Sequence, residues 1–320
     1  MPSASPAPRG LPEHNQQSLT QQWLAILSVA VGAFALVTSE FLPVGVLNDV
    51  ANDLGISAGL AGLMVTLPGI MGALAAPAIS VGVGGLDRRY LLIGLTLVMI
   101  LANAIVAFAG NFHLLLLGRV LLGVSIGGFW ATAIALSGRL APDGMGVAKA
   151  NSIIMAGVTL ATVVGVPVGT WLSGLMGWRM TFLVTALVGV PVLLAQVFLL
   201  PRLMPEQAIR VRDLPALFIN PQARVGLIAV PPIGLAHFAA YTYVAPFLKQ
   251  SAGSHGPTIG SLLLLYGEDG STGQSFAGFA AKRRLPQTLS LVAPLTALVP
   301  AQFPPFPPLL SQRPNNLNYT

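Results

Sequence analysis

Long apolar stretches constrain the fold of this chain more than any other feature of its sequence. They cover residues 23–47, 58–83, 90–109, 112–137, 150–175, 180–200 and 225–247. Each is close to or above the ~20 residues that an α-helix needs to cross about 30 Å of hydrocarbon. Only 8% of the residues are charged and 54% are hydrophobic, whereas roughly a quarter of a soluble protein is charged. The sequence therefore predicts an all-α membrane protein.

Other classes of protein fit this pattern poorly. The strands of a membrane β-barrel alternate apolar and polar residues, and these stretches do not alternate. Cysteine is absent, which removes disulfides, thiolate catalysis and zinc–cysteine sites. The four histidines are scattered, and no basic stripe interleaves with aromatic residues in spite of the net charge of +6. We expect no metal, no cofactor, no nucleic-acid partner and no enzymatic activity.

The placement of lysine and arginine predicts the orientation in the membrane. If the N-terminus is cytoplasmic, the outer loops hold only Arg179 and Lys249. The inner loops then hold Arg88, Arg89, Arg139, Lys149, Arg202, Arg210, Arg212 and Arg224. This bias satisfies the positive-inside rule, and the opposite orientation would violate it. We expect a multi-pass protein of the inner, cytoplasmic membrane.

The chain divides into five segments by composition. Residues 1–22 are polar and predict a disordered cytoplasmic N-terminus, and residues 23–200 predict a bundle of six transmembrane helices. Residues 201–224 form a basic cytoplasmic linker. Residues 225–283 look like the start of a second bundle, and residues 284–320 form a proline-rich tail. Two bundles joined by a linker fit the repeat architecture of transporters.

Two ionisable residues lie deep inside predicted spans. Glu40 is about seven residues before the outer end of its span and Arg119 about seven after the outer start of its own, so both lie roughly 10 Å deep. Equal depth and opposite charge make them a plausible pair. In one interpretation Glu40 is a protonation site tuned by Arg119, because burial favours the neutral acid while a nearby cation favours the carboxylate. The alternatives are a purely structural ion pair or an arginine that snorkels outwards.

Four residues share faces or depths with this pair and are candidate contacts for a substrate in a cavity: Thr38, Phe41, Phe129 and Trp130. Lipid-facing or interfacial aromatic residues are the alternative for them. The run Gly123-Val124-Ser125-Ile126-Gly127 matches the G-x-S-x-G elbow of hydrolases. That elbow needs a strand-to-helix turn, and this run lies within a predicted span, so a serine hydrolase is not expected.

Helix-breaking and small residues also fall within the spans. The candidates for hinges and close packing are Pro43, Gly123, Gly127, Gly165, Pro167 and Gly169, with further prolines at Pro68 and Pro77. The two G-x-x-x-G spacings allow helices to approach closely, and prolines kink helices. Ordinary packing in membrane helices is the alternative explanation.

An ordered series of short motifs gives the chain a family resemblance. The motifs are Glu40-Phe41-Leu42-Pro43-Val44-Gly45, Asp53-Leu54-Gly55-Ile56-Ser57, Asp87-Arg88-Arg89-Tyr90, Gly118-Arg119-Val120-Leu121-Leu122-Gly123, Gly128-Phe129-Trp130-Ala131 and Gly177-Trp178-Arg179. Together, over residues 23–265, they resemble the major facilitator superfamily, in particular its drug:proton antiporter branch and the purine ribonucleoside exporters within it.

The resemblance implies a fold of twelve helices in two halves around a central cavity, lined by the first and fourth helices, which carry Glu40 and Arg119. It implies efflux of purine ribonucleosides or related small molecules, driven by inward movement of protons through a monomer in the lipid bilayer. Export of a sugar or a drug by the same superfamily is one alternative. A truncated membrane protein that does not transport is another.

The resemblance also assigns two motifs to known elements of the family. The loop residues Gly85, Asp87, Arg88 and Arg89 correspond to the inner gating motif. Gly157, Gly165, Pro167 and Gly169 correspond loosely to the antiporter motif of the fifth helix. In this chain Val166-Pro167 stands where that motif has a Gly-Pro step.

The pattern changes after Tyr266. Glu268 and Asp269 place two acids where an eighth span would continue, at a considerable energetic cost in lipid. Beyond Arg283 the prolines are too closely spaced for a helix. We hypothesise that the reading frame shifts near Gly267 and again after Arg283, which would truncate the second half. A genuine proline-rich tail that binds a partner as polyproline II is the alternative.

Overall fold

The computed structural model describes residues 18–83, 85–203, 219 and 224, and every regular element within residues 18–203 is a helix. In order these are α1 (Leu19–Asp53), α2 (Ala58–Ala61), α3 (Leu63–Gly82), α4 (Arg88–Ala107), α5 (Phe112–Leu136), α6 (Val147–Leu160), the π-helical turn η1 (Ala161–Gly165), α7 (Val166–Met176) and α8 (Trp178–Leu199). They form six segments long and apolar enough to cross a membrane. The predicted all-α membrane fold with a complete six-helix first half is thereby confirmed.

The first helix begins earlier than the sequence predicts. Ser18 caps α1 by accepting a hydrogen bond from the main-chain N–H of Gln21, and the Gln21 side chain accepts one from the N–H of Ser18. This reciprocal capping box satisfies two N–H groups that a helix start leaves unpaired. Residues 19–22, predicted as part of a disordered N-terminus, therefore belong to the helix. Most of the predicted linker, the start of the second bundle and the proline-rich tail lie outside the described residues. These undescribed ranges are 204–218, 220–223 and 225–320, together with residues 1–17.

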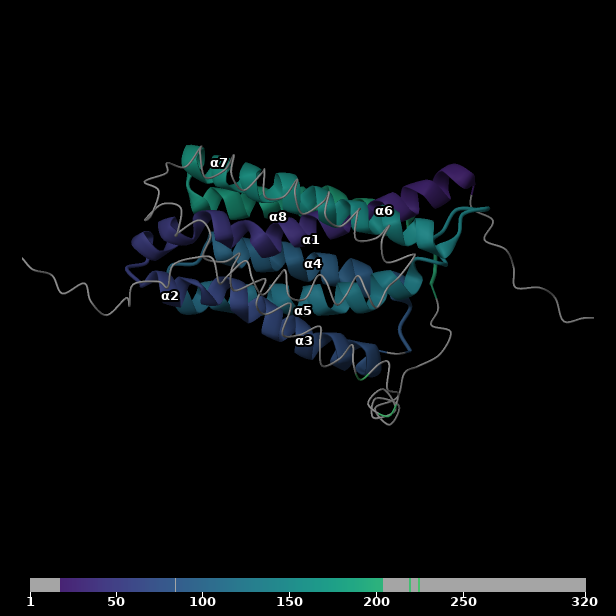
Figure 1. Ribbon diagram of the computed structural model, residues 1–320, viewed down its shortest axis with the longest axis horizontal. Coiled ribbons are helices and arrows are strands. Elements are labelled where there is room, and N and C mark those ends of the chain that lie inside the picture. Colours follow the sequence, from purple (N-terminus) through teal and green to yellow (C-terminus); the bar gives the residue numbers. More distant parts are fainter. Residues whose placement is uncertain (1–17, 84, 204–218, 220–223, 225–320) are drawn as a thin grey trace, which may run out of the picture.

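Helix α1 is the central element of the bundle. In Figure 1 it runs between α7 and α8 on one side and α4 and α5 on the other, and it contacts every other long helix. Helix α5 packs along both α3 and α4, and α4 also packs along α8. Glu40 on α1 and Arg119 on α5 are thus carried by two helices in the middle of the bundle.

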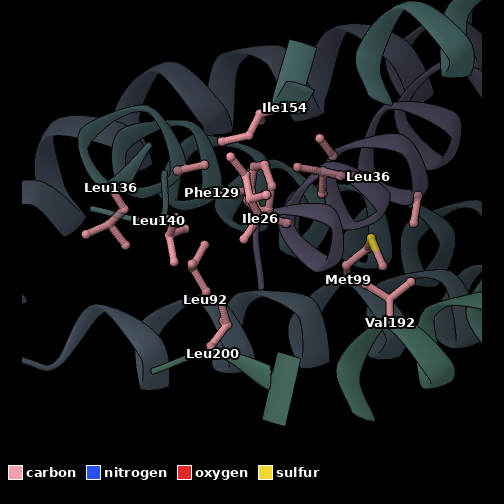
Figure 2. Packing of buried hydrophobic residues seen from close by; sticks show 14 of the residues in the cluster. Ile26, Leu36, Leu92, Met99, Phe129, Leu136, Leu140, Ile154, Val192 and Leu200 are labelled. Atoms are coloured by element: carbon pink, nitrogen blue, oxygen red, sulfur yellow. The ribbon is translucent and has the colours of Figure 1, made fainter. Parts of the chain in front are cut away.

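The largest apolar cluster joins five of the spans (Figure 2). It brings together Ile26 and Leu36 of α1, Leu92 and Met99 of α4, Phe129 and Leu136 of α5, Ile154 of α6 and Val192 of α8. In lipid, burial of apolar side chains gives little net driving force, because the alternative environment is also apolar. The stability of such a bundle therefore depends on close van der Waals packing and on internal hydrogen bonds.

Glycines provide the closest packing against α1. A Cβ atom placed on Gly157 of α6 would lie 2.1 Å from the carbonyl oxygen of Ala30. One on Gly169 of α7 would lie 2.1 Å from Cδ1 of Leu42, and one on Gly165 2.6 Å from Oγ1 of Thr38. The fifth span, which consists of α6, η1 and α7, therefore approaches α1 so closely that no side chain would fit at these positions.

The fifth span changes its helical register where it passes α1. The π-helical turn η1 ends at Gly165, and Pro167 follows at the start of α7. Because proline has no N–H, the helical hydrogen bond to the carbonyl of Val163 is missing at this point. Single π-turns inside membrane helices commonly accompany such interruptions and functional sites.

We expect Gly157→Ala to weaken the packing of α6 on α1. The added methyl group overlaps the Ala30 carbonyl, and overpacking of this kind costs about 1–3 kcal/mol. Unfolding of the purified protein in detergent, followed by circular dichroism, should show the loss. Gly94→Ala is the matched control, because a Cβ on Gly94 of α4 has no atom within 4 Å. Equal stability of both variants would contradict the packing argument.

Candidate functional site

Arg119 lies at the centre of the candidate site. It is the largest fully buried side chain of the described residues, with 1% of its surface exposed. Its Nε donates a hydrogen bond of 2.7 Å to the carbonyl oxygen of Met64 on α3. Its Nη1 and Nη2 donate bonds of 2.9 Å each to the carbonyl oxygens of Ser39 and Glu40 on α1. The guanidinium group therefore connects α5 to two other helices through their main chains.

The structure brings Glu40 and Arg119 together, but in a different way from a simple ion pair. The Glu40 side chain is half-buried and interacts electrostatically with the guanidinium group. Arg119, however, donates to the main-chain oxygen of Glu40, and no hydrogen bond from a described residue reaches the carboxylate. The carboxylate is thus close to a positive charge without being held by it.

A second polar group, from α4, continues the site at Ser39 of α1. The amide Nδ2 of Asn103 on α4 donates to Ser39 Oγ at 2.9 Å and to the carbonyl of Met99 at 2.9 Å. The Ser39 hydroxyl in turn donates to the carbonyl of Ala35. Both side chains are buried, and Oδ1 of Asn103 has no hydrogen-bond partner among the described residues. Asn103 is not among the site residues predicted from the sequence, although an amide within an apolar span was the available signal.

Three of the four predicted substrate contacts lie in one region. Phe41 of α1 packs with Val65 of α3 and Ala161 of η1, and Trp130 of α5 is partly buried against this cluster. The hydroxyl of Thr38, one turn before Phe41 on α1, lies near Gly165 and has no hydrogen-bond partner in the part of the chain that the structure describes. Aromatic surface and an unpaired hydroxyl group are therefore next to the same π-turn.

Phe129, the fourth predicted contact, packs in the core instead. It is 2% exposed and belongs to the large apolar cluster. Its ring lies edge-on to that of Trp130, with 5.7 Å between ring centres, and close to Gly32 of α1. Adjacent residues on a helix point about 100° apart, and here Trp130 lies at the edge of the core while Phe129 fills it.

Glycines of α5 allow it to approach α3 near Arg119. A Cβ on Gly123 would lie 2.6 Å from the carbonyl oxygen of Pro68, and one on Gly127 2.3 Å from that of Gly72. Ser125, between them, donates its hydroxyl to the carbonyl of Leu95 on α4 at 2.7 Å. The G-x-S-x-G run thus lies in a continuous helix with its serine bound to a neighbouring span, which agrees with the rejection of a hydrolase.

The predicted gating loop forms contacts at the end of the bundle where α3 ends and α4 begins. Asp87 caps α4 by accepting from the N–H of Arg89 at 2.9 Å, and it also accepts from the N–H of Leu203 at 2.8 Å. The N–H of Arg88 donates to the carbonyl of Leu203, and the Arg89 side chain donates to the carbonyl of Val197. Gly85 lies exposed just before this group. The loop therefore binds the segment that follows α8.

A second group of contacts lies at the opposite end of the bundle, where α1 ends and α8 begins. Arg179 at the start of α8 forms an ion pair with Asp53 at the end of α1 and donates to the carbonyl of Ala109. It also lies over the Trp178 ring, 4.2 Å from the ring centre. Three described residues of these motifs, Asp53, Trp178 and Arg179, thus meet here, and Arg179 links α1, α8 and the α4–α5 turn.

The chain matches the family model described as Major Facilitator Superfamily over residues 29–313, and it belongs to that family of membrane transporters. The matched stretch extends past residue 265, where the motif resemblance ends, into the proline-rich segment. The chain is 39% identical over 281 residues to the transcription regulatory protein OpdE of Pseudomonas aeruginosa, covering 87% of this chain and 70% of that protein. It is 36% identical over 276 residues to the purine ribonucleoside efflux pump NepI of Salmonella typhimurium, covering 86% and 69%.

Solved structures share the fold at lower identity. A bacterial homologue of the human lysosomal transporter Spinster, inward-facing and unoccupied, superimposes with a TM-score of 0.68 at 16% identity. The match covers 85% of this chain and 64% of that one. A D-xylose–proton symporter gives a TM-score of 0.60 at 15% identity, covering 82% and 69%. This chain therefore spans about two thirds of the length of the relatives that it matches.

We expect Asp87→Ala to release the segment after α8. The substitution removes the cap of α4, which costs about 0.5–2 kcal/mol, and also the acceptor for the N–H of Leu203. Limited trypsin digestion of the purified protein should then cleave faster after Arg202, which mass spectrometry of the fragments would detect. Asp87→Asn keeps an acceptor oxygen and should be cleaved like the wild type. If Asp87→Ala were equally resistant, the contact would not hold this segment.

Proposed function

We propose that the protein is a secondary transporter of the inner membrane that exports purine ribonucleosides or related small molecules in exchange for protons. The observation that carries this proposal is the state of Glu40. Its carboxylate lies at membrane depth, half-buried and near Arg119, yet no described residue holds it by a hydrogen bond. Ionisable groups inside a membrane bundle generally mark ion or substrate pathways.

A carboxylate in this position is suited to exchange protons. The apolar surroundings favour its neutral form, whereas the guanidinium charge favours its ionised form. A hydrogen-bonded ion pair would fix the ionised form, but the hydrogen bonds of Arg119 go to main-chain oxygens. Glu40 can therefore take up a proton when water reaches it from one side of the membrane and release it towards the other.

The proposed cargo is supported by the relatives and by the nearby side chains. A purine base offers a flat aromatic face that can stack on Phe41 or Trp130. A ribose offers hydroxyl groups that can pair with the unpartnered hydroxyl of Thr38. The similarity to purine ribonucleoside efflux pumps at 36% identity points to the same class of molecule. A sugar or drug exporter of the same family is the alternative cargo assignment.

We expect Glu40→Gln to abolish proton-driven transport while preserving insertion. The amide has the same shape but cannot release a proton in the physiological range. The full chain, reconstituted in proteoliposomes with an imposed pH gradient, would be assayed for uptake of radiolabelled inosine and guanosine. Asp49→Asn, the same type of change at an exposed carboxylate of α1, is the control and should keep proton-driven transport.

Two results would contradict this proposal. Unchanged proton-driven flux in Glu40→Gln would remove Glu40 from the coupling mechanism. The second result is a wild-type chain that is folded, as shown by circular dichroism, and yet transports neither nucleoside. That result would argue against the proposed cargo and favour a membrane protein that does not transport. Labelled sugars and cationic drugs in the same vesicles would test the alternative exporters.

The proposed orientation has a cytoplasmic N-terminus. Since the chain contains no cysteine, single cysteines can be labelled without background. We expect His113→Cys, exposed at the start of α5, to react with a membrane-impermeant maleimide in intact spheroplasts. Lys149→Cys, exposed near the start of α6, should react only after the membrane is opened. The reverse pattern would show that the protein is inserted with its N-terminus outside.

A further inference from the structure

We propose that Arg119 stabilises α1 and α3 at their internal prolines by supplying the hydrogen-bond donors that Pro43 and Pro68 lack. The role is that of a positioning residue, which acts on two helix main chains. It goes beyond the proposed function and does not depend on what, if anything, the protein transports.

The spacing of the contacts carries the inference. In an α-helix the carbonyl of residue i accepts from the N–H of residue i+4, and proline has no N–H to donate. Pro43 therefore deprives the carbonyl of Ser39 of its regular donor, and Pro68 deprives that of Met64. These are two of the three carbonyls that Arg119 contacts. The third, on Glu40, follows Ser39 in the same turn of α1.

The membrane environment makes these donors necessary. Within hydrocarbon no water can pair with a free carbonyl, so each must be satisfied inside the protein. The two acceptors lie on different helices, and one planar guanidinium group with five N–H donors can reach both. Its charge makes each of these hydrogen bonds stronger than a neutral one. A single side chain from α5 thereby compensates two prolines of two other helices.

The packing around Arg119 brings the acceptors within reach. One turn after Arg119, Gly123 lets α5 approach Pro68 so closely that a Cβ would lie 2.6 Å from its carbonyl oxygen and 2.9 Å from its Cα. On the other face of α5, a Cβ on Gly118 would lie 2.8 Å from the carbonyl oxygen of Ala102 on α4. The backbone of α5 is therefore pressed against α3 and α4 on either side of the arginine.

An alternative role for Arg119 is purely electrostatic, as the counter-charge of Glu40. The two roles make different demands on the side chain. A counter-charge needs only a cation at the right depth, which lysine supplies. Three separate carbonyls need the spread donors of a guanidinium group, which the point charge of lysine cannot reproduce.

The experiment combines changes at Arg119 with restoration of the missing donors. Arg119→Met removes the guanidinium group and should lower the unfolding temperature in detergent by several degrees. Pro43→Ala and Pro68→Ala return an N–H to each helix, so adding both to Arg119→Met should recover most of the loss. The same pair of changes in the wild-type background should give a clearly smaller gain, because Arg119 already occupies those carbonyls.

Two controls separate this proposal from general effects of proline removal and of charge. Pro77 lies on the same helix α3, but Arg119 does not contact the carbonyl of Ala73, four residues before it. Pro77→Ala should therefore change the stability equally in the wild-type and Arg119→Met backgrounds. Arg119→Lys should be destabilised nearly as much as Arg119→Met. If Arg119→Met does not accumulate in membranes, recovery of its expression level by Pro43→Ala and Pro68→Ala is the readout.

The proposal is overturned if the proline changes give the same increment with and without Arg119, or if Arg119→Lys is as stable as the wild type. It is also overturned if the combined variant fails to accumulate when the proline variants alone do so. All these readouts measure folding. Failure of the proposed transport activity would therefore leave them unaffected, and failure of the rescue would leave the role of Glu40 open to its own assay.

Discussion

The hydrogen bonds from Arg119 to three main-chain carbonyls are the interaction on which the middle of this bundle depends. In water, a kinked helix can pair its free carbonyl with solvent, but in hydrocarbon it cannot. The carbonyls that lose their donor to Pro43 and Pro68 therefore require a donor from elsewhere, and α5 provides it. The cost of burying a guanidinium group is offset in part by strong hydrogen bonds to oxygens that would otherwise be unpaired.

The packing of the bundle follows from the same environment. Because lipid offers little hydrophobic driving force, helices associate through close contact, and glycines provide it at each long interface. Gly157 and Gly169 press the fifth span against α1, while Gly123 and Gly127 press α5 against α3. The close contact between α5 and α3 also brings Arg119 within reach of the Met64 carbonyl. Small residues and the buried charge thus form one structural unit.

The sequence predicted the six spans and the proximity of Glu40 and Arg119, because span length and depth follow directly from residue counts. It did not predict which atoms meet. Pro43 and Pro68 were visible, and the i−4 rule identifies Ser39 and Met64 as acceptors, but only the rotation of α5 about its axis decides which donor reaches them. The same rotation places Phe129 in the core and Trp130 at its edge, a difference that shared depth cannot show. The capping box at Ser18 was readable from Ser18 and Gln21 alone.

These contacts separate two tasks that a simple ion pair would combine. A guanidinium group bound to the Glu40 carboxylate would neutralise its charge and hold the side chain in one state. Bound to the main chain, Arg119 places its charge near Glu40 without a hydrogen bond to the carboxylate, as the proposed proton exchange requires. The helix geometry then stays fixed by hydrogen bonds whose acceptors are main-chain carbonyl oxygens. In the proposed antiport mechanism, a proton would therefore be exchanged at Glu40 without loss of the contacts that hold α1, α3 and α5 together.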